Sequence, residues 1–590
     1  MEFQRTIIWV VFGMSLILLW DRWQVSQGHN AMFFPAAVPE SSKPQGVTAA
    51  PVAAPAAGGA TAGAVHVPAA GPTTGPGAAA GAVGAIDGTP AVAAAAAPVE
   101  VVHVETDLLK VDFDAQGAVM VRAELLHQNL TSQWTAHGLA GFVTRNVLLP
   151  EEHVVLFDRS ATREYLAQSG LFVPAGAAGK LPNHVSTHFS VLPGARVLAD
   201  GQQELAVRFE AESGGVVLRK TFVLRRGRYD IDVQHEAHNV GSEELAPSLY
   251  LQLTRDNGKT EDESSFYKTY TGPAVYTDAE HFRKISFEDI AKKEAKDPKA
   301  ADNGWAGIIQ HYFLGAWIPA AGVQRDFYTR AISDRLFAVG LIVPMGPLAP
   351  GASAVQQAVL YVGPQDQKVL DALAPGLDRV ADYGWLDPIA KPLFWLLGFF
   401  YRIVGNWGWA IVLLTISVKI AFYPLAAAGF KSMARMKEVA PRLAKLKEQY
   451  GDDKAGLQKA MMELYSKEKI NPLGGCLPIL VQIPVFIALY WVLLGSVEMR
   501  NAPWVLWIHD LATPDPWFVL PALMMLTSWI QYTLQPTPPD PVQAKMMMIM
   551  PFVFGVMFFF FPSGLVLYYV LNNGLSILQQ WRINKVIAKK

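Results

Sequence analysis

One lysine stands inside a strongly apolar stretch of the C-terminal third, and its position is the strongest indication of chemistry in the chain. Lys419 lies twelve residues from both Trp407 and Lys431, among Leu, Ile, Val and Phe side chains. If 406–429 is one helix, this lysine lies roughly 18 Å from either end. A charge at that depth costs roughly 3 kcal/mol on insertion scales, and such charges usually face a polar cavity.

Two interpretations of Lys419 remain open. The side chain either faces an aqueous groove, or it extends to the cytoplasmic interface as a purely structural residue. Thr415 lies one turn earlier and would share its face. Polar residues recur in the later apolar segments, at Gln482, Ser528, Gln531, Asn572 and Asn573. Each alone is typical of a hydrogen bond between helices, but several around one lysine indicate a wet groove.

The sequence contains no recognisable catalytic, metal or cofactor motif. Gly258-Lys259-Thr260 resembles the end of a phosphate-binding loop, but Leu253 replaces the glycine that such a loop requires. The single cysteine, Cys476, excludes a disulfide within the chain and a cysteine-based zinc site. His235 and His238 lie on a strand pattern, and we interpret them as structural. We therefore expect no enzyme activity, no metal and no cofactor.

The composition around these residues is that of a membrane protein. The 590 residues are 51% hydrophobic and 17% charged, whereas soluble proteins carry about 25% charged residues. Lys and Arg number 49 against 51 Asp and Glu, a net charge of −2. This balance argues against a general nucleic-acid binder. The apolar residues are concentrated in particular segments, and these segments divide the chain.

The first hundred residues divide into an apolar segment and a tether. An apolar run from Ile7 to Trp20 follows Arg5, and no small-residue cleavage site comes directly after it. Residues 1–25 are therefore predicted to be an uncleaved signal anchor with its N-terminus in the cytoplasm, and a cleaved signal peptide is the alternative. Residues 26–99 are rich in Ala, Gly and Pro, which predicts a flexible linker.

Residues 100–375 show the period-two alternation of β-strands. Along 217–224, for example, Arg219 and Thr221 fall on one face and Lys220 and Phe222 on the other. Gly and Pro punctuate many short strands of this kind, which predicts an antiparallel β-sandwich. None of the apolar runs here is long enough to cross a bilayer, so we expect a domain outside the cytoplasmic membrane.

Membrane-like sequence begins near residue 385. A helix over 385–404 is predicted to lie in the headgroup layer, with a spanning helix as the alternative. Five spanning segments are predicted after it: 406–429, 477–495, 517–534, 546–561 and 564–580. The last two would reach only about 24–26 Å, so we expect either that the bilayer thins around them or that their polar ends dip into it. The predicted fold is an α-helical membrane bundle, an N-terminal anchor plus a five-helix core over 405–590, with a periplasmic antiparallel β-sandwich.

The loop 431–470 is predicted to be a cytoplasmic helical hairpin. Its apolar stripe consists of Met436, Val439, Leu443, Leu446 and Tyr450, and its turn lies at 451–453. The loop carries ten Lys and Arg against six acidic residues, whereas 496–516 carries one Arg against three. The positive-inside rule then places this loop and both termini in the cytoplasm, and residues 26–385 in the periplasm. The charged face of the hairpin would meet a ribosome, a lipid surface or only water.

Several motifs resemble the YidC/Oxa/Alb family of membrane-protein insertases, in the Gram-negative type with a large periplasmic domain. They are 471–478 (NPLGGCLP), 507–511 (WIHDL), 561–569 (FPSGLVLYY), 304–307 (GWAG), 310–313 (QHYF) and 316–319 (AWIP). The resemblance covers both ends of the chain and most of its length, and the linker 26–99 is the poorly matched part.

The resemblance implies insertion and chaperoned folding of nascent inner-membrane proteins, alone or with the Sec translocon. It implies a substrate groove formed by Lys419, Thr415, Gln482, Phe486, Met524, Tyr568 and Tyr569. The best-known members have arginine at the position of Lys419, so the charge is kept but the bidentate pairing is not. The implied partners are nascent membrane proteins, the bilayer, the Sec translocon with its accessory subunits, and, at 431–470, the ribosome or signal recognition machinery. No nucleic-acid specificity is implied.

Two other function classes compete with this one. A membrane solute transporter or channel would use Lys419 to bind anions, but the five unequal segments show no inverted repeat. A membrane-tethered carbohydrate-binding β domain would use its helices only as an anchor, and Lys419 would then have no role.

Overall fold

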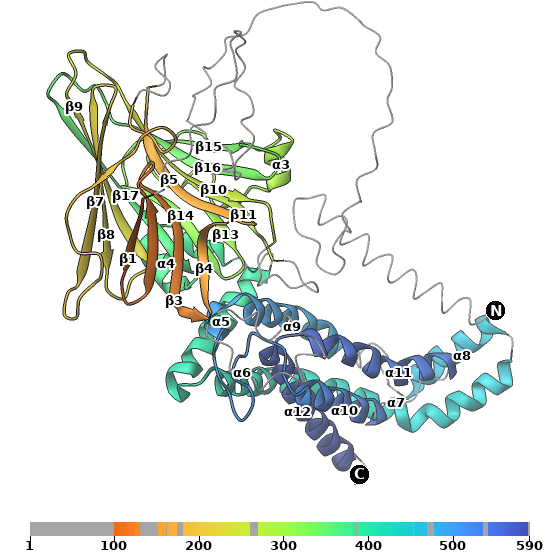
Figure 1. Ribbon diagram of the computed structural model, residues 1–590. Helices are drawn as coiled ribbons and strands as arrows, with labels where there is room; N and C mark the ends of the chain where they lie inside the picture. The colour runs from red at the N-terminus through yellow and green to blue at the C-terminus, as the bar shows by residue number, and fades with distance from the viewer. Residues whose placement is uncertain are drawn as a thin grey trace, which may run out of the picture.

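The computed structural model describes residues 100–129, 152–160, 162–173, 181–259, 269–381, 383, 386–451, 453–468, 477–534 and 541–587. The predicted anchor 1–25, the predicted linker 26–99 and Cys476 lie outside these ranges. Within them the chain forms a β domain and a helical part, which meet near the end of β3 and helix α5 (Figure 1).

The β domain consists of two antiparallel sheets, as the alternation predicted. The eight-stranded sheet has the order β1 (Val101–Glu105), β2 (Leu109–Asp114), β3 (Val119–Asn129), β4 (His153–Arg159), β5 (Glu164–Phe172), β10 (Ser248–Asp256), β16 (Leu336–Pro344) and β15 (Asp326–Ala331). The nine-stranded sheet has the order β12 (Arg283–Lys284), β11 (Gly272–Tyr276), β13 (Trp305–Gln310), β14 (Phe313–Pro319), β17 (Ser353–Pro364), β9 (Asp230–Asn239), β8 (Val216–Arg225), β7 (Glu204–Ser213) and β6 (Ser190–Val191). Apolar side chains of both sheets form one continuous core.

The inward face of β8 includes a lysine among its apolar residues. Lys220 is fully buried, and its Nζ donates hydrogen bonds to Gly117 O at 2.6 Å and to Ser169 O at 2.8 Å. Because these carbonyls belong to the other sheet and its β2–β3 turn, the lysine ties the two sheets together. Burial lowers the pKa of Lys220 to about 7. Its register neighbour His235 is bonded to Ser169 Oγ at 2.9 Å, in keeping with a structural role.

The β domain continues past the predicted boundary at 375. Helix α4 (Gln367–Leu373) and the 3₁₀ helix η2 (Leu377–Val380) pack on Tyr276 and Trp305 at the edge of the nine-stranded sheet. Trp305 Nε1 donates to Pro375 O at 3.2 Å between these two helices. Apolar packing of this kind makes both helices part of the domain.

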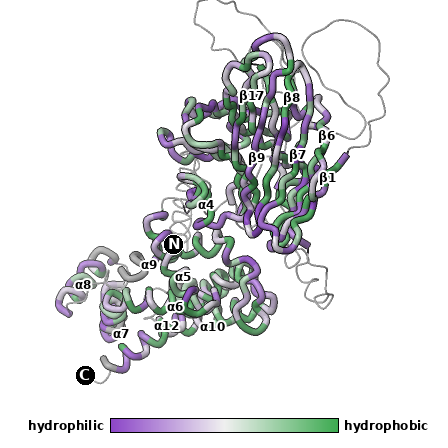
Figure 2. Tube along the Cα trace, turned by 90° about the vertical axis from the view of Figure 1, so that its left-hand side faces the viewer, coloured by the Kyte–Doolittle hydropathy of each residue, from purple (hydrophilic) through white to green (hydrophobic). Residues whose placement is uncertain are grey.

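The helical part is built around its own apolar core. Its elements are α5 (Asp387–Val404), α6 (Trp407–Ala421), α7 (Tyr423–Tyr450), α8 (Lys454–Lys467), α9 (Leu477–Gly495), η5 (Val497–Met499), α10 (Val519–Leu534), α11 (Pro541–Met557), η6 (Phe558–Phe560) and α12 (Ser563–Ile587). Helix α12 packs against α6 and α10, and α5 packs against α6 and α9. Figure 2 shows mostly hydrophobic residues along α5 and α6 and many hydrophilic ones along α8.

The prediction of a single helix over 406–429 is wrong. Helix α6 ends at Ala421 and α7 begins at Tyr423, with a bend of 62° between them. Pro424 has no N–H to donate to the preceding turn, and its ring crowds the carbonyl four residues earlier, which favours a bend at this position. Helix α7 then runs without a break to Tyr450, and the first helix of the hairpin therefore begins inside the segment that was predicted to span.

The predicted bounds of the last two segments also differ from those of the helices. Helix α12 has 25 residues rather than the seventeen of 564–580, a length of about 37 Å. Helix α11 begins at Pro541, five residues before the predicted start. The argument for a thinned bilayer therefore fails for α12. Among the helices that the structure describes, no single one is both long and apolar enough to cross a membrane. The bent pair of α6 and the first part of α7 meets this condition when the two are taken together.

The predicted hairpin is present as α7 and α8. Gly451 takes a φ of 48° at the turn, and Asp453 caps α8 by accepting a hydrogen bond from Gly456 N at 3.0 Å. Val439 and Leu443 of the predicted stripe are buried. The two helices are thus joined by a tight turn with a helix cap, as the sequence pattern indicated.

The predicted amphipathic helix is α5. It buries Ala390 and Leu397 and exposes Trp395, Phe399 and Ile403. Exposed aromatic and aliphatic residues along one face are typical of a helix that rests on a lipid surface. Lys391 lies 3.5 Å from Asp378 of η2 and 3.6 Å from Asp387, which links α5 to the β domain.

Candidate functional site

The break after α6 changes the setting of Lys419. The residue lies in the last turn of α6, two positions before Ala421, and not in the middle of a long straight helix. The free carbonyl groups at a helix C-terminus favour a cation, typically by 0.3–1 kcal/mol for an exposed group. The fold therefore lowers the cost that was predicted for a lysine in the middle of a span.

The amine of Lys419 is held by helix α12. Its Nζ donates a hydrogen bond to Ser576 Oγ at 2.6 Å, and this hydroxyl donates to Asn572 O at 2.8 Å. The lysine is partly exposed, whereas Ser576 is buried. Among the described residues, no carboxylate oxygen lies within 4.0 Å of this amine. The positive charge is thus oriented by a neutral partner and keeps its capacity to attract an anion.

A second hydrogen bond extends this polar arrangement to α9. Gln482 Nε2 donates to Asn572 Oδ1 at 2.7 Å. Asn572 therefore joins Ser576 through its main chain and Gln482 through its side chain. We call Lys419, Ser576, Asn572 and Gln482 the polar track, since together they connect α6, α12 and α9.

An aromatic cluster lies beside the polar track. Phe486, one turn after Gln482 on α9, lies 4.5 Å from the ring of Tyr569 and 6.2 Å from that of Tyr568. Phe558 of η6 lies 4.6 Å from Tyr569. Tyr568 is buried, and Tyr569 and Phe486 are partly exposed. The predicted groove residues of α9 and α12 are therefore neighbours in space.

Two of the predicted groove residues make no direct bond to the polar track. Thr415 is buried and donates back to Ile411 O at 2.7 Å, within its own helix. Met524 is buried on α10, with its sulfur 3.8 Å from Ser528 Oγ. Ser528 accepts a hydrogen bond from Asn573 Nδ2 at 2.9 Å, so Met524 adjoins the α10–α12 contact.

Sequence reasoning missed Ser576, the direct partner of Lys419. A serine in an apolar helix rarely indicates a functional role by itself. Nothing in the sequence indicates that α6 and α12 are neighbours in space. One signal was available, because Ser576 follows Asn572 by four residues and so shares its helix face. That spacing extends a polar face of α12 toward its C-terminal end.

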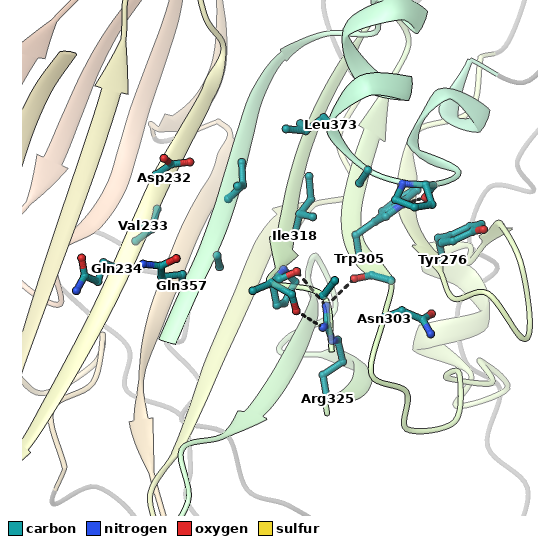
Figure 3. Close-up of a pocket in the computed structure, with 18 of the residues that line it drawn as sticks. Asp232, Val233, Gln234, Tyr276, Asn303, Trp305, Ile318, Arg325, Gln357 and Leu373 are labelled. Atoms are coloured by element: carbon teal, nitrogen blue, oxygen red, sulfur yellow. Dashed lines mark hydrogen bonds between the residues drawn. The ribbon is translucent and has the colours of Figure 1, made fainter. Parts of the chain in front are cut away.

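The β domain contains a cavity, shown in Figure 3. This cavity of about 530 Å³ lies on the outer side of the nine-stranded sheet. Its lining includes Val223, Ile318, Val359, Leu373, Gln234 and Gln357. The side chains of Tyr276 and Trp305, with rings 6.2 Å apart, line one end of it.

Two of the charged residues of this cavity, Arg325 and Asp232, are bound to other protein groups, and the third, Asp278, is exposed. Arg325 donates to the main-chain oxygens of Ala320, Gly304 and Asp302 at 2.6, 2.9 and 3.0 Å, bonds that are visible in part in Figure 3. Asp232 is paired with Arg225. The rest of the described lining presents mainly apolar and amide groups, and the cavity makes a weaker site than the polar track.

Comparisons with known proteins extend over the whole chain. The YidC periplasmic domain family matches residues 101–396, and the 60Kd inner membrane protein family matches residues 399–590. A membrane protein insertase YidC of Cupriavidus necator is 50% identical over 590 residues, covering 100% of this chain and 98% of the relative. That of Bordetella avium is 52% identical, covering 100% and 99%. A solved active YidC insertase with its first transmembrane domain resolved is 18% identical, with a TM-score of 0.36 over 82% of this chain and 93% of that chain.

Proposed function

The chain belongs to the YidC family of membrane protein insertases, and from that premise we propose how its residues act in insertion. The resemblance recognised in the sequence is confirmed by relatives that match from end to end. Its substrates are nascent membrane proteins and its place is the inner membrane. The comparisons give no support to a solute transporter or channel.

The polar track receives the polar flank of a nascent chain on its way across the membrane. A carboxylate placed about 4 Å from Lys419 gains about 4 kcal/mol at an effective dielectric constant of about 20. An acidic residue at the centre of a membrane helix costs about 3 kcal/mol. The attraction is therefore large enough to offset the cost of bringing an acidic flank part of the way. The hydrogen bond between Lys419 and Ser576, at 2.6 Å, is the observation that carries this proposal.

Neutral partners along the track let the flank move onward. Ser576, Asn572 and Gln482 can exchange their mutual hydrogen bonds for bonds to the passing chain, and none of them adds a charge. A carboxylate near Lys419 would hold the ammonium permanently in an ion pair and would compete with the substrate. The track is thus suited to transient binding.

The apolar part of the nascent segment moves along the aromatic cluster. Phe486 and Tyr569 are partly exposed and present ring surfaces next to the track. Transfer of apolar surface out of water is favourable by roughly 25 cal/mol per Å². A segment of membrane length therefore supplies the free energy by partitioning, and no nucleotide is required.

The distribution of charge indicates on which side of the membrane the hairpin and the β domain lie. We infer that the hairpin α7–α8 lies in the cytoplasm and meets the ribosome or the signal recognition machinery. Its loop carries ten Lys and Arg against six acidic residues. The β domain then lies in the periplasm, where the Sec translocon and its accessory subunits are candidate partners. Exposed Trp395 and Ile403 of α5 support contact with the lipid surface between the two.

Insertion into vesicles by the purified full-length chain tests the role of Lys419. We expect Lys419→Arg to keep the rate, because the positive charge remains. Lys419→Glu should lower insertion at least tenfold for a substrate with an acidic flank and change it little for a neutral flank. Lys296→Glu, at an exposed position of the β domain, serves as the charge-matched control. Equal insertion of the acidic substrate by Lys419→Glu and the unaltered chain would contradict the proposal.

A further inference from the structure

The turn that follows α9 is embedded in the β domain. Val497 of η5 belongs to the apolar core of the β domain, although it lies in the helical half of the sequence. Arg500, three residues later, is buried as well. In Figure 1 the two parts of the molecule meet in this region, at the end of β3 and beside α5 and α9. We call residues 496–500 the docking turn.

Arg500 binds two separate elements of the β domain. Its Nη2 donates to Asn129 O at the end of β3, at 2.9 Å. Its guanidinium carbon lies 4.8 Å from the ring centre of Tyr312 and 5.1 Å from that of Phe313. Cation–π contacts of a desolvated arginine are stronger than those at exposed sites. The docking turn is thus held by directional contacts as well as by apolar packing.

The hairpin that receives Arg500 is itself fixed. Gln365 Nε2 donates to Gln310 O at 2.9 Å and to Phe313 O at 3.0 Å, which braces both sides of the β13–β14 turn. His311 in that turn stacks on Tyr312 and has its Nε2 3.4 Å from Leu494 O, in the last turn of α9. Because the β13–β14 turn is fixed by these hydrogen bonds, it can hold the end of α9 in one position.

A second contact links the end of α9 to the β domain. Tyr383 packs in the core of the helical part, close to Gly495, and accepts a hydrogen bond from Gln367 Nε2 of α4 at 2.5 Å. The C-terminal end of α9 is therefore held by two contacts with the β domain. Arg500 contacts the β13–β14 turn, and Tyr383 contacts α4.

Helix α9 connects this junction to the polar track. Gln482 and Phe486 lie on the same helix, roughly 20 Å and 14 Å before its end at Gly495. A helix transmits a shift or rotation of its end to the side chains along it. We propose that Arg500 is a positioning residue: by docking the end of α9, it lets the β domain set the placement of Gln482 and Phe486 against α12. The inference rests on the function proposed above for the polar track.

The test removes the Arg500 contact and then replaces it with a chemical cross-link across the junction. In a Cys476→Ser parent, Asn129→Cys and Arg500→Cys take away the arginine and place one thiol on each side. A bismaleimide of about the length of an arginine side chain then rejoins the two positions. Hydrogen exchange of residues 482–495 and insertion into vesicles are measured before and after linking, on the full-length chain. Arg219→Ala, which breaks exposed ion pairs with Glu210 and Glu236 on the sheet, is the matched control.

Before linking, we expect exchange in α9 to rise at least tenfold and insertion to fall at least fivefold. Linking should return both to within twofold of the parent, and Arg500→Lys, which keeps the charge, should give intermediate values. Insertion at the parent rate in the unlinked protein would overturn the proposal, and so would linking that restores exchange without restoring insertion. The exchange result does not depend on Lys419, so a failure of the polar-track proposal in the Lys419→Glu experiment would be seen separately.

Discussion

Lys419 and Ser576 lie 157 positions apart in the chain, and their amine and hydroxyl are 2.6 Å apart. The contact connects the last turn of α6 to α12 and aims the ammonium toward the polar track. A hydroxyl can orient a cation without neutralising it, which a carboxylate cannot do. The hydrogen bond therefore fixes the direction of the ammonium group and leaves its positive charge able to bind an acidic substrate group.

The first prediction concerns Ser576. Ser576→Ala should lower insertion of acidic-flank substrates two- to fivefold, because the lysine keeps its charge but loses the partner that orients it, a contribution of about 1 kcal/mol. Ser576→Thr keeps the hydroxyl and should insert at the normal rate. Vesicle insertion with acidic and neutral flanks checks both variants. If Ser576→Thr were as impaired as Ser576→Ala, crowding in α12 would be the cause and the hydroxyl would have no special role.

The second prediction concerns the bend before α7. Pro424→Ala restores an N–H and should favour a continuous helix through Phe422, since proline interrupts a helix at a cost of about 3 kcal/mol. Straightening would move Lys419 away from Ser576, and we expect insertion to fall at least threefold. Spin labels on α6 and α7 would report the angle by their separation. Pro441→Ala, inside α7 and beyond the bend, is the control. An unchanged label separation would contradict this account of the break.

The third prediction concerns pH and the β domain. Burial, followed by the nearby cations Lys220, Arg330 and Arg159, lowers the pKa of His184 to about 3. Burial and Lys220 also lower the pKa of His235 well below its usual value. Both histidines have folded-state pKa values below the unfolded value near 6.5, so the unfolded chain binds more protons and stability falls as pH drops below 6.5.

We expect His184 to remove about 2 kcal/mol of stability between pH 7 and pH 5, and His235 to add to the loss in the same direction. Thermal unfolding of the full-length chain, followed by its β-sheet circular dichroism, measures the loss. The double variant His184→Gln and His235→Gln should flatten the pH dependence, even if its stability at pH 7 is lower. An equally steep loss of stability in the double variant would show that other groups cause it.

The sequence predicted the β domain well because one face of each strand is buried, and burial leaves an alternating pattern. That pattern placed Lys220 on the inward face with Phe222, and the structure agrees. What the pattern does not contain is the reason that a lysine is tolerated there. Its partners are main-chain carbonyls of Gly117 and Ser169, which come from the other sheet, and carbonyls have no sequence signature.

The helical part was predicted less well in its boundaries than in its number of segments. Hydropathy averages over windows and therefore merged α6 with the start of α7, although Pro424 marks the break. The polar track depends on which helices are neighbours, and that information lies in packing rather than in any one segment. Lys419 and Gln482 were selected because polar groups inside apolar segments are costly and need partners, and their role in a substrate groove stays a prediction. The two residues meet through Ser576 and Asn572 of α12.

Strand order has a consequence for biogenesis. The last strand, β17, lies between β14 and β9 in the middle of the nine-stranded sheet, so the halves on either side stay unjoined until residues 353–364 emerge. Pairing over such sequence separations is slow, and the exported chain must wait with its edges unpaired. The next residues synthesised are those of α4 and α5. The β domain can therefore finish folding only when synthesis of the helical part begins. Folding of the β domain and membrane insertion of the helices thus start at the same stage of translation.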